Sequence, residues 1–174
     1  TPLYSSAASD VYKRQLFTPD KQQFTEIMAS ANQAACSRAL YFHVPFCEAI
    51  CSFCPFTRGL YKSAEDIDRY TQALIREIEY KAQVMDLKAV PVRAIFFGGG
   101  TPSLLSPRNI QEIGEALHRH FDMCDVQEFS FEFSVTSVTE ERARALAAIG
   151  VTHARFGLQT VSYTHLTLPT NREV

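Results

Sequence analysis

The amino-acid sequence predicts an α/β fold built on a parallel sheet. Along the middle of the chain, short apolar runs alternate with longer amphipathic stretches, an order typical of parallel strands joined by right-handed helical crossovers. The 174 residues are enough for one domain with a sizeable core. Hydrophobic residues make up 46% of the chain and charged residues 21%, as in ordinary globular proteins.

The first strand–helix pair is predicted between residues 39 and 85. The segment "ALYFHV" (39–44) is rich in aromatic and β-branched residues, which favour a strand. Ser63 can cap a following helix, because the apolar residues after it recur at spacings of three, four or seven. These apolar residues are Ile67, Tyr70, Leu74, Ile78 and Met85.

The second pair begins with "AIFF" (94–97), a compact apolar run that three glycines stop and that predicts a buried strand. Ser106 and Pro107 form a cap and first turn for the next helix. One face of that helix carries Ile110, Ile113, Leu117 and Phe121.

The third strand is predicted from "EFSFEF" (128–133), which alternates strictly between phenylalanines and polar residues. A third helix is expected over residues 139–149, with Gly150 in a left-handed cap. "HARFGL" (153–158) is then the fourth strand.

Four sequence features follow these strands at the same edge of the expected sheet. Three cysteines follow the first strand, glycines follow the second, Glu132 ends the third, and Gln159 follows the fourth. In parallel sheets the ligand lies beyond the carboxyl ends of the strands. The sequence therefore predicts a ligand site at this edge.

Cys47, Cys51 and Cys54 are three of the five cysteines and have the spacing C-x3-C-x2-C. Such crowding does not resemble a disulfide framework. Three thiolates on one expected loop can hold metal. Zinc requires a fourth ligand, which His43, Cys36 or Cys124 could supply, whereas three ligands suit an iron–sulfur cluster that keeps one iron open. The simplest alternative is a group of buried small residues.

This spacing, with an aromatic residue just before the last cysteine, resembles the radical S-adenosylmethionine (SAM) superfamily. The segments "YFHVPFCEAICSFC", "FFGGGTPSLL" and "RFGLQT" are similar to those of its oxygen-independent coproporphyrinogen III oxidase-like subgroup. The resemblance covers roughly residues 39–160. It implies the N-terminal part of a partial parallel (β/α)6 barrel, with about four strand–helix units present.

The resemblance also implies cofactors and site residues. Cys47, Cys51 and Cys54 would bind a 4Fe–4S cluster whose fourth iron is offered to SAM. Reductive cleavage of SAM would then give a 5′-deoxyadenosyl radical. The expected SAM-binding residues are Tyr41, Phe53, Gly99, Gly100, Thr101, Glu132 and Gln159. His43 has two interpretations, a proton donor or cofactor contact and a structural hydrogen-bonding residue.

Within the subgroup, the resemblance implies a tetrapyrrole substrate and an electron donor such as flavodoxin or ferredoxin. It leaves open an oxidase, an anaerobic haem-degrading methyltransferase and a haem-binding chaperone. A small zinc-binding interaction module is a more remote alternative. Two residues after Glu132 the subgroup commonly has an acidic or polar residue, and this chain has Ser134. This departure bears on the assignment of the substrate more than on that of the cofactor.

Composition and the chain ends complete the interpretation. A net charge of −2 without a basic run argues against a nucleic-acid surface. The longest apolar runs have five or six residues, so we expect no membrane span and a cytoplasmic location. Residues 1–15 and 161–174 are polar, turn-rich and similar to translated adapter sequence. We interpret them as non-native tails, and residues 16–160 as a partial radical SAM core that is inactive in this truncated form.

Overall fold

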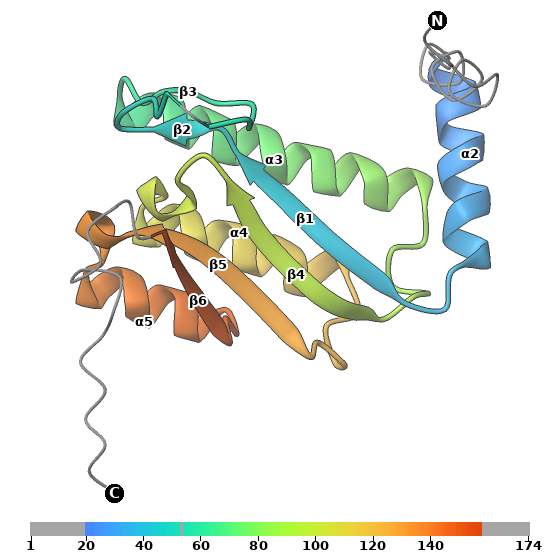
Figure 1. Ribbon diagram of the computed structural model, residues 1–174. Helices are drawn as coiled ribbons and strands as arrows, with labels where there is room; N and C mark the ends of the chain where they lie inside the picture. The colour runs from blue at the N-terminus through green and yellow to red at the C-terminus, as the bar shows by residue number, and fades with distance from the viewer. Residues whose placement is uncertain (1–19, 53, 158–174) are drawn as a thin grey trace, which may run out of the picture.

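The structure is a computed structural model, and it describes residues 20–52 and 54–157. Their main feature is a four-stranded parallel sheet in the order β1-β4-β5-β6 (Figure 1). The strands are β1 (Arg38–Val44), β4 (Val92–Gly99), β5 (Glu128–Ser134) and β6 (His153–Gly157). The predicted α/β class with a parallel sheet is confirmed.

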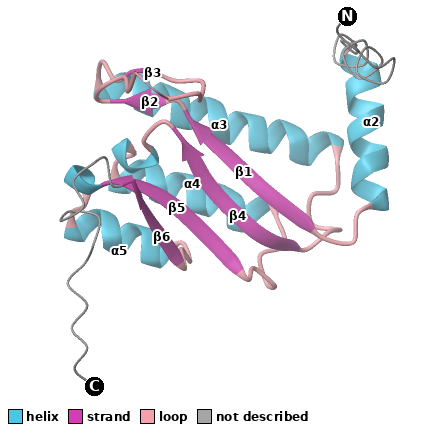
Figure 2. Ribbon diagram, in the orientation of Figure 1, coloured by secondary structure: helices cyan, strands magenta, loops and turns pink. Residues whose placement is uncertain are grey.

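Successive strands of the sheet are joined by helices α3 (Ala64–Val84), α4 (Pro107–His120) and α5 (Glu140–Ala148). All three helices lie behind the sheet in Figure 2, so among the described residues one face of the sheet is covered by helices and the other is open. Helix α2 (Lys21–Ala34) precedes β1 and stands apart from the sheet (Figure 1). Two short strands, β2 (Phe46–Cys47) and β3 (Gly59–Leu60), pair above the end of β1.

The predicted helix boundaries agree with the structure to within one residue at the caps. Ser63 Oγ accepts a hydrogen bond from the Asp66 amide at 3.2 Å, and Ser106 Oγ accepts one from the Asn109 amide at 3.2 Å. Gly150 has φ +95°, the left-handed conformation expected after α5. Met85 and Phe121 are C-caps that follow α3 and α4 and do not lie within them, although both side chains are buried.

One prediction about the strands needs correction. The glycines do not stop the second strand, because β4 continues through Gly98 and Gly99, whose backbones pair with His43 and Val44 of β1. Neither α2 nor the β2–β3 pair was predicted. Leu158, the last residue of the predicted fourth strand, lies outside the described residues.

The core lies between the sheet and its helices. Phe97 of β4 stacks with Phe42 of β1 at 4.6 Å between ring centroids and with Phe131 of β5 at 5.4 Å. Helix α4 covers this layer with buried residues that include Ile110, Ile113 and Leu117. Burial of one such side chain contributes about 1.5–3 kcal/mol. The core fixes the strands and leaves their open face and carboxyl ends for the site.

Candidate functional site

The three clustered cysteines lie directly beyond the carboxyl end of β1. Cys47 is the second residue of β2, and Cys51 and Cys54 lie between β2 and β3. The prediction that all three occupy a loop is therefore wrong for Cys47, because its carbonyl accepts a hydrogen bond from the Tyr61 amide at 2.7 Å. Within the connection, the Cys54 amide donates to the Cys51 carbonyl at 3.2 Å.

All three thiols are free, with Cys51 exposed and Cys47 and Cys54 half-buried. In residues 20–52 and 54–157, no three His, Cys, Asp or Glu side chains lie close enough together to hold a metal ion. The cysteine ligand set therefore stays a prediction. Cys36 lies just before β1 and Cys124 just before β5, at the amino ends of the strands and far along the fold from this connection.

The glycine turn after β4 is hydrogen-bonded to the segment that carries Cys47. The Gly100 amide donates to the Val44 carbonyl at 2.8 Å, and the Thr101 amide donates to the Phe46 carbonyl at 2.7 Å. A Cβ atom at Gly100 would lie 2.6 Å from the Phe46 carbonyl oxygen and 3.0 Å from Cys47 Sγ. Only a glycine allows this approach, so the turn forms one wall beside the first cysteine thiol.

Gly99 makes a second close approach, in this case to His43 of β1. Its φ is +109°, and a Cβ atom there would lie 2.6 Å from the His43 ring. The Nε2 atom of His43 lies 2.6 Å from the Thr57 carbonyl, and Nδ1 lies 3.1 Å from the Tyr41 hydroxyl. A carbonyl can only accept, so Nε2 carries the proton and the Tyr41 hydroxyl donates to Nδ1. His43 thus links β1 to the cysteine segment, which agrees with its structural interpretation.

Glu132 lies on the open face of β5, beside the glycine turn. A Cβ atom at Gly98 would lie 3.0 Å from the Glu132 Oε2 atom. Burial raises the pKa of this carboxyl, whereas a hydrogen bond from the Gly99 backbone and the charge of Arg155 oppose that rise. Tyr41 is 56% exposed on the same face, and burial together with the charge of Glu132 raises the pKa of its hydroxyl. A ligand above β4 can therefore contact both side chains.

The structure brings together most of the predicted site and leaves two positions undetermined. Gly99, Gly100, Thr101 and Glu132 share the carboxyl-end rim with the cysteines, and Tyr41 lies on the open face near Glu132. Phe53 and Gln159 lie outside the described residues. Arg58 makes further contacts within the cysteine connection, since its guanidinium donates to the Phe56 carbonyl at 2.9 Å and to the Cys51 carbonyl at 3.4 Å.

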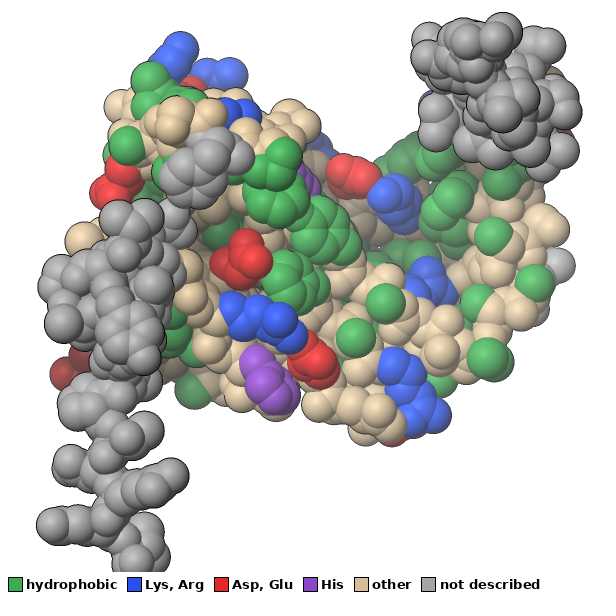
Figure 3. All heavy atoms as spheres, in the orientation of Figure 1, with side chains coloured by type: hydrophobic (Ala, Val, Ile, Leu, Met, Phe, Trp, Pro, Cys, Tyr) green, Lys and Arg blue, Asp and Glu red, His purple; other side chains and the backbone are tan. Residues whose placement is uncertain are grey.

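Sequence reasoning also missed the open-face group of Phe96, Glu128 and Arg155. The Arg155 Nη2 atom lies 2.7 Å from Glu128 Oε1, and its guanidinium carbon lies 5.2 Å from the Phe96 ring centroid. Figure 3 shows basic, acidic and hydrophobic side chains gathered on this face of the sheet. The alternation that predicted the phenylalanine face of β5 also contained the signal for Glu128 on the opposite face.

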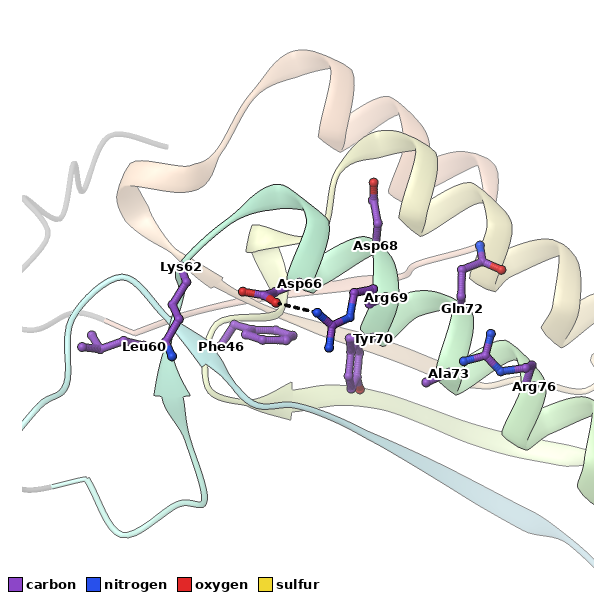
Figure 4. A pocket seen from close by; sticks show the side chains of 10 residues that line it. All are labelled: Phe46, Leu60, Lys62, Asp66, Asp68, Arg69, Tyr70, Gln72, Ala73 and Arg76. Atoms are coloured by element: carbon purple, nitrogen blue, oxygen red, sulfur yellow. Dashed lines mark ion pairs between the residues drawn. The ribbon is translucent and has the colours of Figure 1, made fainter.

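A pocket of about 870 Å³ lies outside the rim, between the β2–β3 pair and the first half of α3 (Figure 4). Phe46 and Leu60 form its end near Cys47, since Phe46 precedes Cys47 and Leu60 pairs with it. Lys62, Arg69 and Arg76 contribute basic side chains to the lining of the pocket. The Arg69 Nη1 atom lies 3.6 Å from Asp66 Oδ1. None of the described residues predicted to bind SAM lines this pocket, so we do not assign it as the cofactor site.

A parallel sheet that gathers a three-cysteine segment, a glycine turn and a half-buried carboxylate at its carboxyl rim defines a cofactor-binding α/β protein. Residues 41–173 match the radical SAM superfamily. The chain therefore belongs to this superfamily, whose members use a 4Fe–4S cluster and SAM. The match includes residues 161–173 of the predicted C-terminal tail, and the tail boundaries stay a prediction.

Three curated relatives share about a third of their aligned residues with this chain. Anaerobilin synthase of Escherichia coli O157:H7 is 34% identical over 71% of this chain and 27% of its own length. Heme chaperone HemW of Lactococcus lactis is 32% identical over 69% and 30%, respectively. Anaerobic coproporphyrinogen III oxidase 1 of Cereibacter sphaeroides is 32% identical over 70% and 26%. The chain thus spans less than a third of the length of these relatives.

A solved structure, coproporphyrinogen III oxidase (HemN) from Escherichia coli, described as a radical SAM enzyme, has the same fold. It superposes with a TM-score of 0.72 at 25% sequence identity, covering 88% of this chain and 37% of that one. The predicted membership of the radical SAM superfamily, with coproporphyrinogen III oxidase-like relatives, is confirmed. None of these comparisons supports the alternative of a small zinc-binding interaction module.

The residues present fit the cluster and the cofactor that the family uses. Three free thiols follow β1, and the bare backbone of Gly100 leaves space against Cys47 Sγ that a Cβ atom would fill. Thiolates are the protein ligands of 4Fe–4S clusters.

Among the helices of the described residues, none is both long and apolar enough to cross a membrane.

Proposed function

We propose that this chain is the cluster- and SAM-binding part of a radical SAM oxidoreductase that acts on a tetrapyrrole, as coproporphyrinogen III oxidase does. The observation that carries the proposal is the hydrogen-bonded junction between the glycine turn and the cysteine segment. It puts Gly100 against Cys47 Sγ and leaves Glu132 at the same rim. The names of the relatives supply the tetrapyrrole substrate class.

Each part of the site has a role in this proposal. Cys47, Cys51 and Cys54 hold the cluster through their thiolates, and the turn of Gly99, Gly100 and Thr101 admits the cofactor next to bare backbone. A cluster held there, once reduced, would supply the electron for cleavage of a carbon–sulfur bond of SAM, which would give methionine and a 5′-deoxyadenosyl radical. The side chains of Tyr41, Phe53, Glu132 and Gln159 orient SAM in the cleft.

Cysteine substitution tests the cluster assignment. Each of Cys47, Cys51 and Cys54 is replaced by alanine, and the protein is reconstituted anaerobically with iron and sulfide. Each variant should lose the iron–sulfur absorbance and most of the bound iron, whereas Cys36→Ala and Cys124→Ala, the matched controls at the other end of the strands, should keep both. Retention of the cluster in Cys51→Ala would contradict the assignment.

Two alternatives from the same group of relatives remain testable, a haem chaperone and an anaerobic haem-degrading methyltransferase. Formation of 5′-deoxyadenosine that porphyrin accelerates indicates an oxidase or a methyltransferase, and transfer of a methyl group to haem distinguishes the second. Tight stoichiometric haem binding without SAM cleavage indicates a carrier.

An electron donor and a location complete the proposal. A small acidic flavodoxin or ferredoxin would reduce the cluster, and the pocket with Lys62, Arg69 and Arg76 lies beside the strand that carries Cys47. A cytoplasmic location suits a cysteine set used for a cluster and not for disulfides.

The domain assignment also stays a proposal, with tails at 1–15 and 161–174 around a partial core at 16–160. Strand β6 is at one edge of the described sheet, and its Phe156 is 48% exposed. An open parallel edge leaves backbone groups unpaired and promotes association. We therefore expect residues 16–160 to load a cluster without sustained turnover, and multiple turnovers by soluble monomer would contradict this.

A further inference from the structure

Arg155 of β6 lies on the open face of the sheet, next to the proposed SAM-binding carboxylate. In the β5–β6 register its Cα pairs with that of Glu132. The guanidinium turns along β5, where Nη2 lies 2.7 Å from Glu128 Oε1 and Nε donates to Ser130 Oγ at 3.0 Å. Two hydrogen bonds from different guanidinium nitrogens fix the plane of this group.

Aromatic side chains fix the same guanidinium from a second direction. Its central carbon lies 5.2 Å from the Phe96 ring centroid, within the range of a cation–π contact. The Phe96 ring is stacked on Tyr41 of β1 at 5.9 Å. A Cβ atom at Gly98 would meet both the Phe96 ring, at 2.6 Å, and Glu132 Oε2, at 3.0 Å. Phe96 thus contacts the anchored guanidinium and lies near the Glu132 carboxylate.

The polar groups around Glu132 come from all four strands of the sheet. Arg155 of β6 lowers the carboxyl pKa, as does the Gly99 backbone of β4, and both act against the larger effect of burial. Tyr41 and His43 project from β1 on the same face, and Glu128 and His153 lie near the guanidinium. Among these groups Arg155 carries a charge that does not titrate in the physiological range.

We propose that Arg155 is a positioning residue for SAM binding: anchored by Glu128, Ser130 and Phe96, it holds a fixed positive charge on the strand beside Glu132 and favours the ionised form of that side chain. An ionised Glu132 attracts the cationic cofactor, whereas a protonated one does not. Arg155 therefore acts through Glu132 without contacting SAM. The inference rests on the proposed function in that SAM is the ligand.

The first experiment needs no cofactor. The titration of the Glu132 carboxyl is followed by carbon NMR in the full chain and in Arg155→Met and Arg155→Gln, either of which suffices if the other does not fold. The midpoint should move to higher pH in both. Arg93→Gln is the matched control, since Arg93 pairs with Asp125 at 3.0 Å at the amino end of the strands and its loss removes the same charge. An unchanged midpoint in the Arg155 variants overturns the proposal.

The second experiment measures SAM affinity by calorimetry in the cluster-loaded full chain between mildly acidic and neutral pH. Arg155→Met should weaken SAM several-fold, with a larger loss at the acidic end. In a Glu132→Gln background the same substitution should have no further effect, because its target is gone. An equal loss in both backgrounds overturns the proposal. Absence of SAM binding by the unsubstituted chain instead contradicts the proposed function, and the NMR titration then decides the role of Arg155.

Discussion

At the scale of single residues, Gly99 has the most constrained environment in the site. Its positive φ disfavours any side chain, and a Cβ atom would overlap the His43 ring. We expect Gly99→Ala to displace His43, break its link to the Thr57 carbonyl, and weaken SAM binding at least tenfold, or about 1.4 kcal/mol. Cluster content should be retained, because the cysteines are unchanged.

A nearby glycine provides the control for this substitution. Gly59 is also in the cysteine region, but a Cβ atom there has its nearest neighbour at 3.9 Å, and its φ is not in the left-handed region. Gly59→Ala should therefore keep SAM affinity when measured by calorimetry. Equal affinities in Gly99→Ala and the unsubstituted protein would show that this part of the turn does not border the cofactor.

Glu132 and Glu128 should respond oppositely to pH, although both lie on the open face of β5. Burial raises the pKa of Glu132, so the folded state favours its protonated form. Its contribution to stability is present below the unfolded-state pKa and is lost as the pH rises through the folded one. Glu132→Gln should raise the thermal midpoint at neutral pH and leave it unchanged near roughly pH 4.

Glu128 is the matched comparison for that experiment. A hydrogen bond from Ser130 and one from Arg155 lower the pKa of Glu128, so its ionised form stabilises the fold above the unfolded-state pKa. Glu128→Gln should lower the thermal midpoint at neutral pH, and the difference should disappear as the pH falls. A stability loss in both variants at neutral pH would contradict the assigned environments.

At the scale of secondary-structure elements, Gly114 controls how closely α4 approaches the end of α5. A Cβ atom at Gly114 would overlap Cγ2 of Ile149, the residue that caps α5. Alanine normally stabilises a helix interior by about 1 kcal/mol relative to glycine. Here we expect Gly114→Ala to destabilise the protein by about 1–3 kcal/mol, as in an overpacked core.

A double-mutant cycle separates these two effects. In an Ile149→Ala background the overlap is gone, and Gly114→Ala should become neutral or stabilising in a denaturant titration. The same cost in both backgrounds would show that the helix contact does not set the effect.

The elements that sequence reasoning predicted are those with a repeating pattern or a cap. The spacing after Ser63 and Ser106 gave two helices to within one residue, and alternation in residues 128–133 gave β5. The β2–β3 pair has two residues in each strand, too few for a period. The glycines after Phe97 predict the end of a strand, but β4 continues through them because backbone pairing with β1 requires no side chain.

The candidate site, too, could be predicted only in part from the sequence. Cys47, Gly100 and Glu132 could be placed at one rim, because each follows or ends a strand of a parallel sheet. The role of Arg155 could not be predicted, since its partners Glu128 and Phe96 lie far away in sequence and meet it only through strand register.

At the scale of the whole molecule, the position of the outer pocket predicts where an electron donor docks. Lys62 is exposed beside the strand that carries Cys47, and Arg76 is exposed at the far end of the same pocket (Figure 4). Replacing both with glutamate should slow cluster reduction by flavodoxin, with a loss of the salt dependence and a change of roughly tenfold. Reduction by dithionite, a small molecule, should be unaffected and serves as the control.

The two hydrogen bonds from Gly100 and Thr101 to the start of the cysteine segment have a consequence for the order in which the site is assembled. Both bonds join backbone atoms and use no cysteine side chain, so we expect them to form before the thiolates bind iron and the ordering on cluster loading to fall on the connection between Cys47 and Gly59. Hydrogen exchange should therefore show slow Gly100 and Thr101 amides before and after loading, whereas amides around Cys51 slow only afterwards. The side of the site formed by Gly100 and Thr101 would then be ordered before loading, and the side around Cys51 would become ordered when the cluster binds.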